Sequence, residues 1–433
     1  MILEQHYDDE VLIAFLGDPP AAGRDAHLAR CPSCADTLHS LRSLAGGLVE
    51  PAVWELRELD ETPRQATIDL LRARQAELRR EDAAAFVKRL VAMPSSSWRT
   101  SVQTHPPRWP AETALALVAR AERVVFDDPP KALTLSEIAV QVSVRSGDAS
   151  AQSAALRELG YVLYFTGRYP EAVRATEKAE DLLTDRDPFQ VARIALQRAL
   201  IAGDMGDHEQ SRSLAHNCAD VFLRLGDLSR YVSARRTEAI ALYKDRRYRD
   251  AVVVYESVRE TAENLGGQTF AGLLQNLAIC HRELGAFEPA IDLFLQSLDS
   301  FERLGLRAAA TKCRWHLGRV FVAQGRFEDG LKQLRAVQES FCELSMAQDV
   351  ALVTLDIAQV LAADGQTSEV IEHCRRAVEY FSGAGLSHSE GALTAIALIR
   401  EGAEQGRLDE KFLLRARASI DRGPVLQLAF LTD

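Results

Sequence analysis

The sequence contains 433 residues, of which 47% are apolar and 7% aromatic, with 62 acidic and 51 basic side chains and a formal net charge of −11. This apolar content excludes an intrinsically disordered chain, and the length predicts several domains or a repeat array. The acidic charge argues against direct binding to nucleic acid or to an anionic membrane. Because Ala and Leu are abundant and alternating β-branched residues are scarce, we expect an all-α fold.

The N-terminal segment, MILEQHYDDE, carries acids where a secretory signal needs basic and apolar residues, and no long apolar run predicts a membrane helix. We therefore expect a cytoplasmic protein. The seven cysteines are an odd number and do not form the pattern of a disulfide framework. Five of them stand alone in helical segments and are predicted to be small buried hydrophobes: Cys218, Cys280, Cys313, Cys342 and Cys374.

The other two cysteines lie close together near the N-terminus. In the segment HLARCPSC, His27, Cys31 and Cys34 have the spacing H-x3-C-x2-C. Two thiolates and an imidazole at this spacing are typical zinc ligands, and a closed tetrahedral site needs one more. The candidates for the fourth ligand are His6, before the apolar stretch VLIAFL, and His39, beyond Cys34.

A short helix ending in LGD, then HLARCPSC and a further helix, resembles the zinc-binding anti-sigma-factor domain over about the first 50 residues. The resemblance implies that His6, His27, Cys31 and Cys34 bind Zn2+, and so favours His6 over His39. It also implies a small helical domain, residues 1–50, that masks a sigma factor from RNA polymerase. In some members of that family the thiolates are oxidised and zinc is lost.

Three interpretations of these residues remain open. The first is a structural zinc site, because a segment this short with few apolar residues needs a metal or a similar cross-link to fold. The second is a zinc site whose thiolates also sense oxidation. The third, a thioredoxin-like CxxC enzyme, is disfavoured because no strand precedes Cys31.

Residues 51–93 are predicted to be a helical linker, since Ile68, Leu71, Leu78 and Leu90 recur at helical spacing. The following segment, MPSSSWRTSVQTHPPRWP, is rich in Pro and Ser, which predicts a loop and a domain boundary at residues 94–110. Trp98 and Trp109 are candidate anchors for this loop.

Residues 111–420 repeat with a period near 40. A small residue recurs at intervals of 39, 40, 39, 40 and 40, and a second small residue follows it by twelve positions. This pattern predicts antiparallel helix pairs in close contact, with a glycine that ends each first helix. The first small residues are Gly160, Ala199, Ala239, Ala278, Gly318 and Ala358.

This repeat resembles the tetratricopeptide repeat (TPR), in a version longer than the usual one. The resemblance implies a right-handed superhelix of seven or eight helix pairs, followed by a C-terminal tail at 421–433. Arg246 stands where the other repeats have the turn glycine. In TPR proteins the first helices line a concave groove that binds a peptide or helix of another protein.

Alignment of the repeats projects a basic and aromatic set of side chains onto this groove: Arg157, Tyr161, Tyr164, Arg236, Tyr243, Lys244, Asn276, Arg282, Trp315 and Arg319. In an acidic protein this set suggests an acidic peptide or helix as the ligand. The alternative is a solvated face whose bases form ion pairs with Glu283 and Asp204. Trp315 could equally be a core residue.

The sequence contains no P-loop, no G-x-S-x-G and no H-E-x-x-H motif, so no enzymatic activity is predicted. The first hypothesis is a non-enzymatic bacterial regulator, with an anti-sigma-like zinc module joined to a TPR scaffold that binds a protein partner. The alternative hypothesis is a general TPR adaptor, in which the zinc module is purely structural and unrelated to transcription.

Overall fold

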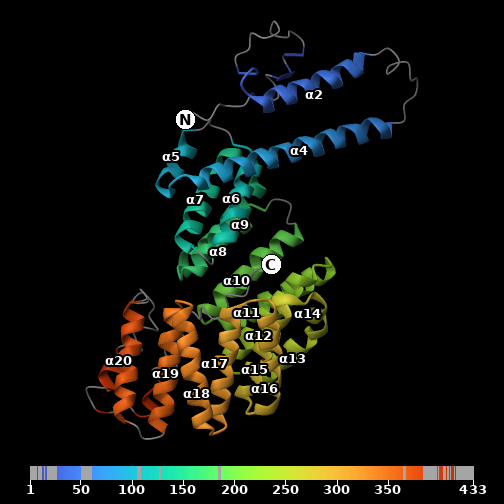
Figure 1. Ribbon diagram of the computed structural model, residues 1–433. Helices are drawn as coiled ribbons and strands as arrows, with labels where there is room; N and C mark the ends of the chain where they lie inside the picture. The colour runs from blue at the N-terminus through green and yellow to red at the C-terminus, as the bar shows by residue number, and fades with distance from the viewer. Residues whose placement is uncertain are drawn as a thin grey trace. The chain divides into compact units, whose positions relative to one another are not determined.

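The computed structural model describes most of the chain, and all regular elements among the described residues are helices (Figure 1). The described ranges are 27–49, 61–104, 109–125, 128–183, 187–363 and 367–383, with Tyr7, Leu12, Ile13, Phe15, Leu16 and scattered residues between 397 and 415. The all-α class is therefore confirmed. The predicted tail at 421–433 and His6 lie outside the described residues.

The chain divides into two compact units, residues 1–79 and 80–433. The first unit contains helix α2 (Pro32–Val49) and the start of α4 (Glu61–Ala92). Among the described residues of this unit, four buried residues form a core, with five partly buried apolar side chains around them. The four are Leu12, Cys31, Cys34 and Leu38.

The segment predicted to be a loop at 94–110 is partly helical instead, with a short 3-10 helix η1 (Ser95–Ser97) and helix α5 (Trp98–Gln103). Trp98 is only 1% exposed, and its indole N–H donates to the carbonyl of Met93 at 3.0 Å. Trp109 packs against Phe86 of α4 with ring centroids 4.9 Å apart. The two buried tryptophans thus anchor the described part of this segment, and residues 105–108 lie outside the described residues.

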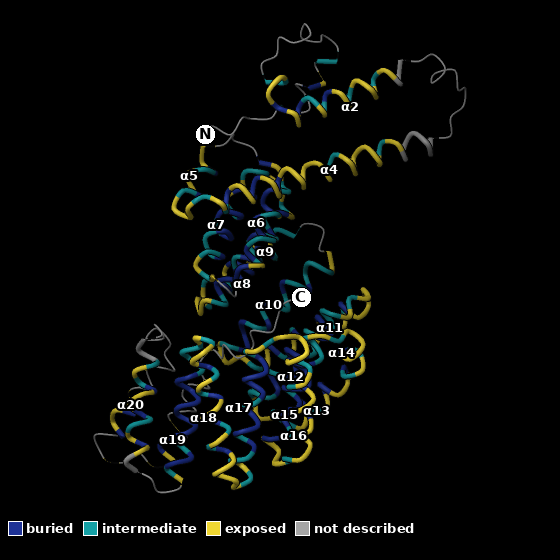
Figure 2. The backbone as a smooth tube through the Cα atoms, viewed as in Figure 1, coloured by how far each residue is buried: buried dark blue, intermediate teal, exposed yellow. Residues whose placement is uncertain are grey.

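Seven described helix pairs follow and stack in chain order (Figure 1). Their buried faces point toward neighbouring helices, and their exposed faces lie outside (Figure 2). The pairs are α6 (Ala111–Val124) with α7 (Pro129–Ser146), α8 (Ala149–Phe165) with α9 (Tyr169–Asp181), α10 (Pro188–Asp204) with α11 (His208–Arg224), α12 (Leu228–Lys244) with α13 (Tyr248–Ser257) and α14 (Arg259–Leu265), α15 (Gly267–Glu283) with α16 (Phe287–Arg303), α17 (Arg307–Ala323) with α18 (Phe327–Glu343), and α19 (Ala347–Ala363) with α20 (Thr367–Gly383).

The small residues of the repeat lie where helices cross. A Cβ added at Gly160 would lie 2.9 Å from Cγ2 of Thr176, and one added at Gly330 would lie 2.5 Å from Cγ2 of Val322. Real Cβ atoms essentially never approach heavy atoms this closely. The regular spacing in the sequence is therefore a packing requirement, because a larger side chain at these positions would push the paired helices apart.

Four of the five single cysteines are buried as predicted, namely Cys218, Cys280, Cys313 and Cys374, and burial raises the pKa of each thiol to about 12. They are therefore protonated at neutral pH. Cys342 differs from the prediction because it is exposed.

The second helix of the fourth pair is interrupted at Val258, between α13 and α14. The amide of Val258 donates to the carbonyl of Tyr255 at 3.2 Å, one residue short of the α-helical partner. That partner, the carbonyl of Val254, accepts a hydrogen bond from the Ser257 hydroxyl at 2.7 Å instead. A side chain has thus entered the helical ladder, which is a known cause of helix breaks.

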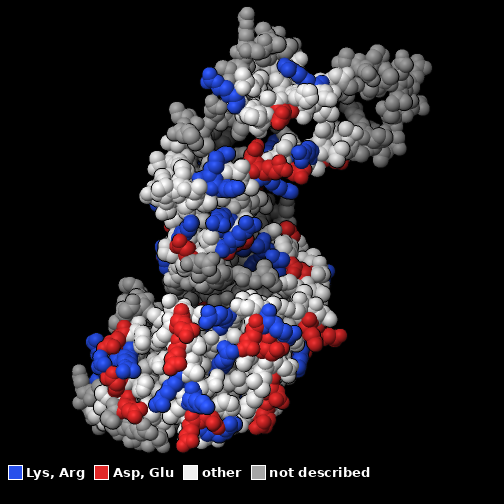
Figure 3. All heavy atoms as spheres, in the orientation of Figure 1, with Lys and Arg blue, Asp and Glu red and all other residues white. Residues whose placement is uncertain are grey.

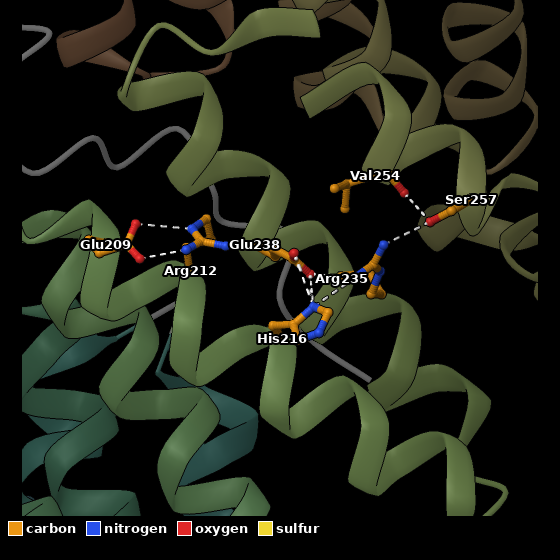
Figure 4. A network of polar contacts seen from close by, with 7 residues as sticks. All are labelled: Glu209, Arg212, His216, Arg235, Glu238, Val254 and Ser257. Carbon is orange, nitrogen blue, oxygen red and sulfur yellow. Dashed lines mark hydrogen bonds and ion pairs between the residues drawn. The ribbon is translucent and has the colours of Figure 1, made fainter. Parts of the chain in front are cut away.

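Helix α12 holds the interrupted segment in place (Figure 4). Arg235 donates to the Ser257 hydroxyl at 3.1 Å and to the carboxylate of Glu238 at 2.6 Å. Nδ1 of His216, on α11, lies 3.2 Å from Oε1 of Glu238. The network therefore ties three consecutive helices together on the side of α12 that faces α11 and α13.

The turn inside the fourth pair contains a residue with a strained backbone conformation, Arg246. Arg246 has a φ of 60°, the left-handed conformation that glycine adopts at the same place in other repeats. For a residue with a Cβ this conformation costs roughly 1–2 kcal/mol. We predict that Arg246→Gly raises the thermal unfolding midpoint, by an amount that corresponds to about 1 kcal/mol.

The matched control is Arg247→Gly, since Arg247 has an ordinary φ of −85°. This variant should be neutral or less stable, because glycine gains backbone entropy in the unfolded chain. Equal effects of the two substitutions in thermal denaturation would contradict the strain at Arg246.

Candidate functional sites

The His and Cys residues of the first unit converge in space. The ligand atoms of His27, Cys31 and Cys34 all lie within 4.8 Å of one another, and no other His, Cys, Asp or Glu cluster of this kind occurs among the described residues. The carbonyl of His27 accepts the amide of Cys31 at 2.8 Å, which forms a turn directly before α2. Cys31 and Cys34 are buried and His27 is half-buried. One helical turn thus brings the three groups together.

The geometry fits a tetrahedral zinc ion. With usual Zn–N and Zn–S bond lengths, an imidazole nitrogen and a sulfur on the same zinc lie about 3.6 Å apart. Nε2 of His27 lies 3.4 Å from Sγ of Cys34. Two thiolates and one imidazole are also a usual zinc donor set, so His27, Cys31 and Cys34 are suited to hold the ion.

The surroundings of the cluster bear on the fourth ligand. The amide of Tyr7 donates to Sγ of Cys34 at 3.3 Å, and the Tyr7 ring centroid lies 4.4 Å from that of His27. His6 is not itself described, but it immediately precedes a residue in contact with two of the ligands. His39 is exposed on α2. The choice between His6 and His39 therefore stays a prediction.

The second candidate site is the face formed by the first helix of each pair, called here the first-helix face. All ten residues projected onto it lie on first helices: Arg157, Tyr161 and Tyr164 on α8, Arg236, Tyr243 and Lys244 on α12, Asn276 and Arg282 on α15, Trp315 and Arg319 on α17. Basic and acidic side chains are interspersed over the visible surface of the solenoid (Figure 3).

Asp204 links three first helices. It accepts a hydrogen bond from the Tyr164 hydroxyl at 2.9 Å and forms an ion pair with Lys244, so α8, α10 and α12 meet at one carboxylate. Burial, and secondarily Asp204, raises the pKa of Tyr164 well above its usual value. The hydroxyl therefore stays protonated and keeps donating.

Further along the face, the basic side chains are also balanced internally. Arg282 is 8% exposed, forms an ion pair with Glu283 at 2.5 Å and has Nη1 3.2 Å from Nδ1 of His316. Arg319 lies 3.8 Å from the carboxylate of Asp356. Lys244 and Arg282 thus form the ion pairs with Asp204 and Glu283 that were the alternative to ligand binding.

Trp315 belongs to the core. It is 1% exposed, packs edge-on against Phe341 at 5.8 Å, and its indole N–H donates to Asp356 at 2.7 Å. It is therefore not a ligand-contacting residue in this conformation. Tyr243 is also largely covered, and burial raises its pKa to about 12.

The sequence prediction missed a polar cluster where α6, α8 and α10 meet. Glu122 lies 3.2 Å from Arg157 and 3.8 Å from Arg193. Gln197 donates to the carbonyl of Arg157 at 3.0 Å, and Glu158 is 1% exposed. A signal existed, because a polar residue recurs two positions before each small residue of the repeat: Glu158, Gln197, Thr237, Asn276, His316 and Asp356.

Two groups of this cluster have displaced pKa values. Burial raises the pKa of Glu158 to about 8, and the charge and hydrogen bond of Glu122 add to the rise, while Arg157 opposes it. Burial, together with the nearby guanidinium groups of Arg157 and Arg230, lowers the pKa of Arg193 to about 10. At neutral pH Glu158 is therefore mostly protonated.

Comparisons with known proteins support the fold. The sequence matches no family model and no curated protein. Among solved structures, the chain is similar to a Rap protein complexed with competence and sporulation factor, with a TM-score of 0.53, 12% identity, and coverage of 81% of this chain and 98% of that one. It is also similar to aspartyl phosphate phosphatase F from Bacillus subtilis, with a TM-score of 0.51, 11% identity and coverage of 79% and 92%.

A third similar structure is a signal transduction ATPase with numerous domains and a tetratricopeptide repeat sensor, from Pyrococcus horikoshii, with a TM-score of 0.53 and 13% identity. The match covers 82% of this chain and 54% of that one. Identities this low show the fold alone, which is a TPR-like helical solenoid. No described helix is long and apolar enough to cross a membrane.

The cluster in the first unit predicts metal binding. We expect untagged protein to contain one zinc ion per chain, and Cys34→Ser or His6→Ala to lower that content, because each removes one ligand of a closed site. His39→Ala is the matched control and should leave zinc unchanged. Metal analysis decides this, and zinc-free wild-type protein or zinc loss in the His39 variant would contradict the ligand set.

The displaced pKa of Glu158 predicts a dependence of stability on pH. Because the native pKa of about 8 exceeds the usual value of 4.5, the folded chain binds more protons than the unfolded chain between these values. The contribution of protonated Glu158 to the free energy of unfolding is complete below pH 4.5. It is lost as pH rises toward 8, and the free energy of unfolding then falls by up to about 1.4 kcal/mol per pH unit.

Glu158→Gln removes this dependence, so its unfolding midpoint should exceed that of the wild type increasingly from pH 5 to pH 8. Glu171→Gln is the control, because the hydrogen bond from Arg168 lowers the pKa of Glu171 below 4.5, so this variant and the wild type should give parallel curves from pH 5 to pH 8. Parallel stability curves for wild type and Glu158→Gln across this range would contradict the assignment.

Proposed function

We propose that this protein is a non-enzymatic regulator in which a zinc-binding, anti-sigma-like module is joined to a TPR-like scaffold for a protein partner. The observation that carries the proposal is the His27, Cys31 and Cys34 cluster, set before a helical-repeat solenoid in one chain. Zinc would help to hold the first unit folded, since both cysteines belong to the core that its described residues form.

The scaffold half of the proposal is supported by the fold and by one of the similar structures, the Rap protein complexed with competence and sporulation factor. For this chain we propose that an acidic segment of a partner binds the first-helix face. Arg157 and Arg236 of that face are buried or nearly so. Because water is largely excluded there, their attraction to an acidic side chain would be stronger than at the open surface.

The transcription half of the proposal rests on the donor set and its order in the sequence. The partner of the first unit would then be a sigma factor, held away from RNA polymerase. The alternative, a general adaptor whose zinc module is purely structural, is favoured by one observation, because both cysteines lie inside the small apolar core with Leu12 and Leu38.

Affinity capture from the native host separates these two functions. We expect the full-length chain to retain a sigma factor, identified by mass spectrometry, and the Cys31→Ser, Cys34→Ser double variant to lose it, since the first unit would no longer fold around zinc. Proteins bound by the solenoid should remain with the double variant. Capture of partners without any sigma factor would leave the adaptor as the function.

A further inference from the structure

The polar cluster at α6, α8 and α10 differs in charge balance from the rest of the first-helix face. Elsewhere on this face, each of several bases has a carboxylate of its own, as in the pairs of Lys244 with Asp204 and Lys312 with Asp349. In the cluster, one carboxylate, Glu122, contacts both Arg157 and Arg193, while Glu158 lies 4.0 Å from Arg157, at the limit of an ion pair. The second acid, Glu158, is mostly neutral at pH 7.

Burial makes this excess of positive charge costly. The side chains of Arg157 and Arg193 are 12% and 23% exposed, so water screens them poorly. The cluster would therefore be stabilised by one more anion.

Hydrogen bonding in the cluster is also incomplete. Nε of Arg157, Oε1 of Glu158 and Oε1 of Gln197 are buried and have no hydrogen-bond partner among the described residues. Buried polar atoms normally have hydrogen-bond partners. Three buried atoms without one in a single cluster therefore indicate that a bound group would complete their hydrogen bonds. An amino acid residue of a bound segment offers both kinds of group, a carboxylate that accepts and a backbone N–H that donates.

We propose that Arg157 and Arg193, with Glu122, Glu158 and Gln197, form a subsite for an acidic side chain of the protein segment that binds the first-helix face. The inference rests on the proposed function and places its anion contact near the start of the solenoid, away from Arg282 and Arg319. Glu122 is 42% exposed, so the cluster reaches the surface of the solenoid at this residue.

Neutral Glu158 is part of this subsite, because an ionised carboxylate there would repel the incoming one. The charged groups that face Glu158 are Glu122 from α6, Arg157 on its own helix and Arg193 from α10. Binding should accordingly weaken as pH rises above 8, where Glu158 ionises. Glu158→Gln should remove this loss.

The test uses an amidated Glu-Ala repeat peptide and its Gln-Ala counterpart, titrated into the full-length chain and followed by fluorescence anisotropy. We expect the wild type to prefer the Glu peptide, and Arg193→Gln to weaken that binding at least about tenfold, because truncating one partner of a buried charge pair is costly. Arg193→Lys keeps the charge and should restore part of the affinity. Unchanged thermal midpoints show that the variants are folded.

The matched control is Arg319→Gln, since Arg319 lies on the same face with a similar exposure of 28% but is balanced by Asp356. It should change the affinity less than about twofold. Equal binding of the two peptides, or an equal loss in the Arg193 and Arg319 variants, would overturn the subsite.

Capture of the native partner by the wild type and by Arg193→Gln tests the subsite separately from the proposed function. If wild type and Arg193→Gln capture the same partner equally, the subsite is wrong and the scaffold function stands. If the Glu peptide binds through Arg193 but the wild type captures no protein partner, the subsite stands and the scaffold function is wrong.

Discussion

Close approach of helices at small residues is the constraint on which the second unit depends. At Gly160 and Gly330 a single added carbon would collide with the facing helix, and the same two positions of the repeat recur along the whole solenoid. Small residues let the two helices of a pair pack closely. The first helices of successive pairs also lie close enough for their polar side chains to meet, as Tyr164 and Lys244 do at Asp204. The solenoid is therefore joined by a polar seam as well as by its apolar core.

That seam determines what the first-helix face can bind. Asp204 joins Tyr164 and Lys244 across three helices, and Asp356 holds both Trp315 and Arg319. Bases that are matched in this way contribute to the fold and have little attraction left for a ligand. The proposed binding of an acidic segment would then be confined to the start of the seam, where two arginines share Glu122.

The first unit obeys a different constraint. Its described buried residues include the two cysteines themselves. The same thiolates would thus serve as core and as ligands, so folding and metal binding would be one event. This explains why one short motif carries both the structural and the regulatory interpretations of this unit.

The sequence by itself determined the helical class, the repeat with its small residues, and the convergence of His27, Cys31 and Cys34, because each depends on spacing along one or two helical turns. Tertiary structure decided the rest. Trp98, in the segment 94–110 that composition predicted as a loop, is buried, and Trp315 lies in the core. Whether a base such as Arg193 keeps an unbalanced charge depends on which carboxylates approach it from other helices. Glu158 and Glu122 are 35 and 71 residues away in the sequence, and the periodicity of one helix relates only residues three or four positions apart.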